Sequence, residues 1–99
     1  PPLVALVTHI VGPTTPSVAF DKNAKTDDPV AMYLNDTYTI PANLAGLPAM
    51  SLPAGLSPQG MPIGLHIVAP YMEEGRMLNL AHQFQLNTDF HRAFPEAYV

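Results

Sequence analysis

The sequence predicts an α/β fold that forms part of a larger globular body. Residues 3–11 and 63–69 have the apolar, β-branched patterns of strands, and residues 73–86 have the apolar spacing of an amphipathic helix. Hydrophobic residues make up 47% of the 99 residues and charged residues only 12%, about half the usual share. This balance excludes a chain that is disordered through low hydrophobicity and high charge.

The distribution of charge indicates that the middle of the chain is covered by other protein. Residues 37–72, a run of 36, contain no Asp, Glu, Lys or Arg. A free-standing domain of this size buries only about two thirds of the surface that its unfolded chain exposes. Its helices and sheets therefore need solvated faces, which normally carry charge. We therefore expect residues 1–99 to form a single, incomplete domain that aggregates or folds only partially when isolated. The alternative is a small domain whose surface relies on Ser, Thr, Asn and Gln.

The charge and the cysteine count exclude several classes of function. Four Lys and Arg against eight Asp and Glu give a net charge of −4, so no basic patch is present to bind nucleic acid directly. The lack of cysteine excludes disulfides, thiolate metal sites and cysteine nucleophiles. No targeting signal is convincing, and prolines interrupt each long apolar run, so no membrane span is expected. The cytosol is the default compartment.

Three elements are predicted in the first half of the chain. Residues 3–11 form a buried strand, which the Gly-Pro pair at 12–13 ends. A helix covers residues 28–35, because its leading Asp can accept backbone N–H groups and the following Pro suits the first helical position. A second short helix covers residues 39–46, with Gly46 as its C-terminal stop.

A β-hairpin and a helix are predicted in the second half. Residues 49–52 form a short strand between two prolines, residues 56–60 a turn, and residues 63–69 an alternating strand. Residues 73–86 form a helix that begins with two glutamates, as the helix dipole favours, and residues 87–99 are irregular. The helix is expected to bury one stripe: Met77, Leu80, Ala81 and Phe84.

Few residues could carry chemistry. The four histidines lack the paired spacing of zinc ligands, so no metal site is expected, and His66 is interpreted as a polar strand residue with a local hydrogen-bond partner. A triad of Ser51, His66 and Asp36 is conceivable, but no nucleophile-elbow pattern surrounds the serine. The structural interpretation, in which Ser51 is an inward or edge residue of a short strand, is therefore favoured.

Asp36 is the last charge before the neutral run and lies between the two short predicted helices. A carboxylate beside an apolar region needs a cationic partner, several donors or water. It is either a helix-end or N-cap carboxylate, or an anchor for the ammonium or amide group of a ligand.

Residues 27–67, DDPVAMYLNDTYTIPANLAGLPAMSLPAGLSPQGMPIGLHI, resemble the C-terminal portion of amidase-signature enzymes. The motifs DP-x-x-MY-x-x-D, T-x-P-x-NLAGLP and LPAG…G-PIGL lie in register. The first of these and the tail that begins at residue 87 are most similar to the A-subunit family of glutamyl-tRNA(Gln) amidotransferases. The resemblance covers about nine tenths of the chain. It departs at residues 1–8, and at His66, where the family often has glutamine.

The resemblance implies an α/β/α sandwich around a mixed sheet, of which this chain supplies the C-terminal part. It implies a glutaminase subunit in a complex with subunits B and C. That complex converts Glu-tRNA(Gln) to Gln-tRNA(Gln) with glutamine as ammonia donor, while ATP and magnesium are used in a partner subunit. It also implies that tRNA binds only to the assembled complex, that the protein does not bind a membrane and that it is cytoplasmic or in an organelle matrix.

The resemblance assigns a role to one residue of this chain. Asp36 aligns with the aspartate that helps to hold the amino-acid end of the substrate glutamine. The catalytic lysine and two serines of the family are expected upstream, so no catalytic residue and no bound cofactor are expected in residues 1–99, and the isolated chain is expected to be inactive. Two other hypotheses remain: a fragment of another amidase-signature amide hydrolase, and a non-catalytic structural fragment.

Overall fold

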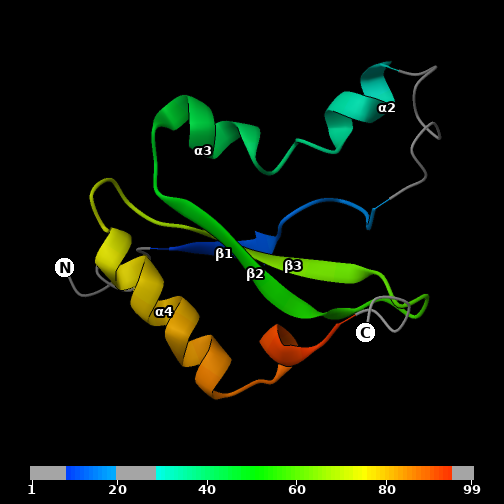
Figure 1. The fold of residues 1–99 in the computed structure, drawn as a ribbon. Helices are drawn as coiled ribbons and strands as arrows, with labels where there is room; N and C mark the ends of the chain where they lie inside the picture. Colours follow the sequence, from blue (N-terminus) through cyan, green and yellow to red (C-terminus); the bar gives the residue numbers. More distant parts are fainter. Residues whose placement is uncertain (1–8, 20–28, 95–99) are drawn as a thin grey trace.

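A three-stranded antiparallel sheet separates two layers of helices in the computed structural model, which describes residues 9–19 and 29–94 (Figure 1). The elements, in chain order, are β1 (Ile10–Pro13), α2 (Pro29–Leu34), α3 (Ile40–Ala45), β2 (Ala49–Leu56), β3 (Pro62–Val68), α4 (Glu74–Leu86) and the 3₁₀ helix η1 (Phe90–Arg92). The helices α4 and η1 lie on one side of the sheet, and α3 lies over the other (Figure 1). The predicted α/β class is confirmed. The parallel pairs of a mixed sheet are not found among these three strands.

The predicted hairpin is confirmed, and its second strand is the centre of the sheet. The strand order is β1-β3-β2, with β3 antiparallel to both neighbours. The turn between β2 and β3 closes through Ser57, whose N–H donates to Met61 O at 2.7 Å and whose carbonyl accepts from Gly60 N–H at 2.8 Å. The side chain of Ser57 adds a third bond, because its Oγ accepts from Met61 N–H at 3.1 Å.

Of the two prolines predicted to end the outer strands, Pro13 does so and Pro53 does not. β1 ends at Pro13, whereas β2 continues through Pro53 to Leu56. Among the described strands each of these pairs only with β3, so a nitrogen without hydrogen can face away from the partner. The bond made by the next residue shows this for Pro13. Thr14 N–H donates to Gly64 O at 3.1 Å. Because successive backbone nitrogens of a strand point in opposite directions, the Pro13 nitrogen points away from β3. The earlier part of the predicted first strand, residues 3–8, lies outside the described residues.

Both short helices are confirmed, with bounds close to those predicted. α2 begins at Pro29 as its Asp-Pro signal indicates, although the proposed cap at Asp28 lies outside the described residues. α3 ends at Gly46, which has the left-handed φ of 69° and donates its N–H to the carbonyls of Ala42 and Asn43. Glycine adopts this conformation without the steric cost that a Cβ brings.

The core lies between the sheet and α4. Leu52, Ile67 and Ala69 from the sheet side meet Met77 and Ala81 of α4, and each is at most 6% exposed. The predicted stripe on this helix is therefore right for Met77 and Ala81, and Phe84 is partly buried against the same cluster.

Two predictions about the C-terminal third are wrong. Leu80 is 39% exposed, because it flanks the narrow strip of α4 that contacts the sheet. The segment after residue 87 is not wholly irregular, since Phe90 begins η1 against β2. The ring of Phe90 lies 6.1 Å from that of Phe84, centroid to centroid, a spacing typical of attractive aromatic pairs.

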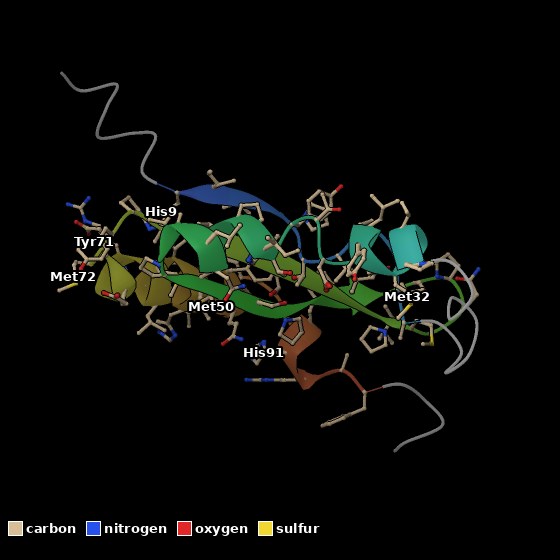
Figure 2. All side chains as sticks on the ribbon, turned by 90° about the horizontal axis from the view of Figure 1, so that it is seen from above. His9, Met32, Met50, Tyr71, Met72 and His91 are labelled. Carbon is tan, nitrogen blue, oxygen red and sulfur yellow. The ribbon has the colours of Figure 1, made fainter. Side chains whose placement is uncertain are left out.

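Much apolar surface of the chain remains uncovered. Figure 2 shows Tyr71 and Met72 projecting from the end of the molecule where α4 starts, and both are at least 70% exposed. Other large apolar side chains that are more than half exposed are Ile10, Val11, Val30, Tyr33, Leu34, Leu44, Leu78, Leu86 and Phe94. Such a surface is typical of a segment that packs against further protein.

Candidate functional site

The backbone of Asp36 is held between the end of α2 and the start of α3. Its N–H donates to Tyr33 O at 3.0 Å. Its carbonyl oxygen accepts three hydrogen bonds: from Thr39 N–H at 3.1 Å, from Ile40 N–H at 3.1 Å and from the Thr39 hydroxyl at 3.2 Å. Hydrogen bonds from both helices thus converge on one residue, which fixes the direction in which its side chain leaves the backbone.

The carboxylate of Asp36 is available to a ligand. The residue is exposed, and no described residue forms an ion pair or a hydrogen bond with its side chain. It does not cap α3, because the N-cap position of that helix is Thr39. The N-cap interpretation is therefore wrong, and Asp36 is a helix-end residue whose side chain has no partner among residues 9–19 and 29–94.

A second contact supports the segment just before Asp36. The hydroxyl of Ser17, in the segment that follows β1, donates to Asn35 Oδ1 at 3.2 Å. This bond links the end of α2 to a part of the chain 18 residues earlier. Neighbouring segments thus hold the α2–α3 junction in place.

Two adjoining cavities lie between α3 and the sheet. The more polar one, of about 300 Å³, is lined by hydroxyl, amide and imidazole groups together with small apolar residues: Thr14, Thr39, Asn43, Ser51 and His66 are the polar members. The more apolar one, of about 460 Å³, is lined among others by Ile10, Tyr38, Leu47 and Val68. His66 lines both cavities.

A hydroxyl bridge crosses the sheet beside the polar cavity. The hydroxyl oxygens of Thr14 and Ser51 lie 2.6 Å apart, although the residues are 37 positions apart in the sequence. The bridge passes over Gly64 of the central strand. A Cβ at that position would lie 2.6 Å from Thr14 Oγ1 and 2.7 Å from Ser51 Oγ, which is closer than real Cβ atoms come to other groups.

The structure brings two members of the conceivable triad together but leaves the third apart. Ser51 lies opposite His66 on neighbouring strands, and both line the polar cavity. Asp36 does not line that cavity, and the Ser51 hydroxyl is engaged with Thr14. The geometry agrees with the structural interpretation of Ser51 as a residue of an outer strand.

His66 is buried, with 8% of its surface exposed, and lies on the central strand. No hydrogen bond to its ring is found among residues 9–19 and 29–94, and the local partner stays a prediction. Its opposite neighbours are Gly12, which has no side chain, and Ser51, whose hydroxyl bonds to that of Thr14.

The roles of Thr14 and Thr39 are not predicted from the sequence. Thr14 could not be found from local signals, because its partner is remote in sequence. For Thr39 a signal exists, since it follows Asp36 by three residues, the spacing at which a hydroxyl can return to a carbonyl at a helix start.

In the described part of the chain, no three His, Asp or Glu side chains gather as metal ligands would. No helix there has both the length and the apolar character needed to cross a membrane.

Comparison with known proteins gives matches along most of the chain. The family model described as Amidase matches residues 4–78. The chain is 62% identical over 88 residues to the A subunit of glutamyl-tRNA(Gln) amidotransferase from Thiobacillus denitrificans, and 55% identical over 87 residues to that from Nitrosospira multiformis. These matches cover 89% and 88% of this chain and 18% of each relative. The chain thus spans about a fifth of the length of these relatives.

A solved structure also matches. The crystal structure of the A subunit of glutamyl-tRNA(Gln) amidotransferase from Thermotoga maritima aligns with a TM-score of 0.66 and 39% sequence identity. The alignment covers 75% of this chain and 16% of that protein. The sheet and helices described above therefore have a counterpart in a much longer chain.

Proposed function

Because this chain belongs to the Amidase family, we propose that it is part of the glutaminase subunit of a glutamyl-tRNA(Gln) amidotransferase. The observation that carries the proposal is the 62% identity over 88 residues to a protein named as the A subunit of that enzyme. The complete enzyme would convert Glu-tRNA(Gln) to Gln-tRNA(Gln), with glutamine as the ammonia donor and with ATP.

In this proposal residues 1–99 are a single, incomplete domain, the C-terminal part of the amidase-signature sandwich. The rest of the subunit covers the uncharged residues 37–72 and the exposed apolar side chains. The large apolar side chains of the described residues that are more than half exposed support this view.

Asp36 is proposed to hold the amino-acid end of glutamine through its ammonium group. A carboxylate with no partner in the described part of the chain, on a backbone held by four hydrogen bonds, suits this role, because charge-assisted hydrogen bonds are stronger than neutral ones and depend on placement. Anchoring the ammonium end places the side-chain amide of glutamine at a defined distance from the nucleophile, which raises its effective concentration there.

The remaining parts of the reaction are assigned to protein outside this stretch. The catalytic lysine and two serines would lie upstream in the same polypeptide, and ATP and magnesium would be used in a partner subunit. Subunits B and C would complete the complex and meet the tRNA. We propose a cytoplasmic or organelle-matrix location, and no membrane contact.

A chimera tests this proposal. The matched segment of the Thiobacillus denitrificans protein is replaced by this chain, and the complex is assembled with that organism's partner subunits. Formation of Gln-tRNA(Gln) from Glu-tRNA(Gln), glutamine and ATP is expected, and a complex that lacks the segment should be inactive. Glutaminase activity that ignores tRNA and ATP would instead favour a free-amide hydrolase. Loss of glutamine hydrolysis in a properly assembled chimera would contradict the proposal.

The isolated chain should be inactive and poorly folded. Because its large apolar side chains lack cover, residues 1–99 alone are expected to aggregate or to unfold without a cooperative transition. Thermal unfolding followed by circular dichroism, with the oligomeric state measured by light scattering, checks this. A monomer with a sharp, reversible transition would contradict the incomplete-domain proposal.

A further inference from the structure

Thr39 occupies the N-cap position of α3 but does not cap it. An N-cap threonine normally accepts a hydrogen bond from the backbone N–H two or three residues on. The second helical residue here is Pro41, which has no N–H. Thr39 also has helical dihedral angles, with φ of −99° and ψ of −30°, and its hydroxyl makes no cap bond. Its side chain is therefore not needed to begin the helix.

The hydroxyl of Thr39 is directed back to Asp36 instead. It donates to Asp36 O at 3.2 Å, next to the N–H groups of Thr39 and Ile40, which each donate to the same oxygen at 3.1 Å. Three donors on one carbonyl hold the peptide plane that follows Asp36. Because that plane includes the Cα of Asp36, the bonds also restrict where the carboxylate can lie.

Thr39 is itself anchored to the helix that covers the sheet. Its carbonyl accepts from Asn43 Nδ2 at 2.8 Å, and the half-buried side chain lines the polar cavity with Ser51 and His66. The residue thus links Asp36, at the exposed junction, to the packed interface between α3 and the sheet.

We infer that Thr39 is a positioning residue for the glutamine site and acts by holding Asp36 through its hydroxyl. This inference rests on the proposed function, in which the Asp36 carboxylate receives the ammonium group of glutamine. An exposed carboxylate must lose conformational freedom to bind a small ligand, and a pre-ordered backbone reduces that loss before the ligand arrives. The hydroxyl should therefore affect the affinity for glutamine more than the later chemistry.

The test compares four variants of the chimeric complex with the parent and with Asp36→Asn. Thr39→Val removes the hydroxyl and keeps the branched shape, Thr39→Ala removes it without a β-branch, and Thr39→Ser retains it. Thr37→Val is the matched control, because the Thr37 hydroxyl also donates to a carbonyl three residues back, that of Leu34 at 2.7 Å. Each is assayed for Gln-tRNA(Gln) formation with glutamine and with ammonium chloride as nitrogen donor.

Loss of the Thr39 hydroxyl is expected to raise the KM for glutamine about three- to tenfold, as removal of one neutral hydrogen bond does. The kcat and the ammonia-dependent rate should change less than about twofold, and Thr39→Ser and Thr37→Val should match the parent within the same margin.

Several outcomes would overturn the inference. The inference fails, and the proposed role of Asp36 stands, if Asp36→Asn raises the KM for glutamine while Thr39→Val and Thr39→Ala do not. It also fails if these two variants lower the ammonia-dependent rate as strongly as the glutamine-dependent rate, or if Thr39→Ser does not restore the parent KM, since either result indicates a general structural role. If Asp36→Asn itself leaves the KM unchanged, both the inference and the proposed role of Asp36 are overturned.

Discussion

Replacement of Asp36 by asparagine is expected to raise the KM for glutamine by about 10- to 100-fold, the effect of losing a hydrogen bond to a charged group. Asparagine keeps the size of the side chain and can accept a hydrogen bond, but it lacks the charge that attracts an ammonium group. Ammonia-dependent amidation should survive, because ammonia does not use this anchor. The measurement is Gln-tRNA(Gln) formation by the chimeric complex over a range of glutamine concentrations.

Asp89→Asn is the matched control for this prediction. It removes the same charge from an exposed residue just before η1, whose carboxylate lies 4.0 Å from Nη1 of Arg92 at the end of that helix. Its KM for glutamine should equal that of the parent. An Asp36→Asn complex with unchanged dependence on glutamine would remove this residue from the site.

Substitution of Gly64 by alanine is expected to destabilise the assembled protein by about 1–3 kcal/mol, the usual effect of overpacking. The added methyl group would lie 2.6 Å from Thr14 Oγ1 and 2.7 Å from Ser51 Oγ. The hydroxyl bridge would have to break, or β1 and β2 would have to move relative to the central strand. Urea-induced unfolding of the assembled chimera, followed by fluorescence, measures the change in the free energy of unfolding.

Two further variants separate this clash from a general effect of losing glycine. Gly75→Ala, where a Cβ meets no atom within 4 Å, should be neutral or slightly stabilising because alanine favours the helix. In a Ser51→Ala background one of the two close contacts is absent, so Gly64→Ala should cost less there than in the parent. Equal costs in the two backgrounds would show that the serine hydroxyl is not the obstacle.

The elements that were predicted correctly carry their signals within a few residues. Pro29 suits the first turn of a helix, Gly46 adopts the left-handed conformation that ends one, and Ser57 closes a tight turn through its own backbone. These preferences act between atoms that are already close along the chain. Neighbouring segments therefore do not need to be known.

The wrong predictions concern properties that depend on distant neighbours. The predicted strand 49–52 continues through Pro53 because β2 is an outer strand, and that outer position follows from the strand order. The exposure of Leu80 depends on how α4 is rotated on the sheet. Phe90 begins a 3₁₀ helix, and its ring lies beside that of Phe84. No local sequence pattern predicts this contact.

The candidate site divides in the same way. Asp36 was found because it is the last charge before an uncharged run and because its surrounding motif resembles that of a family. The hydrogen bonds that hold its backbone, and the role of the Thr39 hydroxyl, became visible only with the turn geometry between α2 and α3. The meeting of Thr14 with Ser51 depends on the register of three strands.

By itself, the sequence determined the local elements and the family resemblance. Its excess of apolar over charged residues also predicted that further protein covers this part of the fold. The tertiary structure decided which strands are outer, which face of β3 carries the polar cavity and which hydroxyl groups meet across Gly64. The physical reason is how far apart along the chain the interacting residues are. Backbone preferences and hydrophobic content are properties of short segments, whereas register, burial and hydrogen-bond partners arise only when segments far apart in the chain pack together.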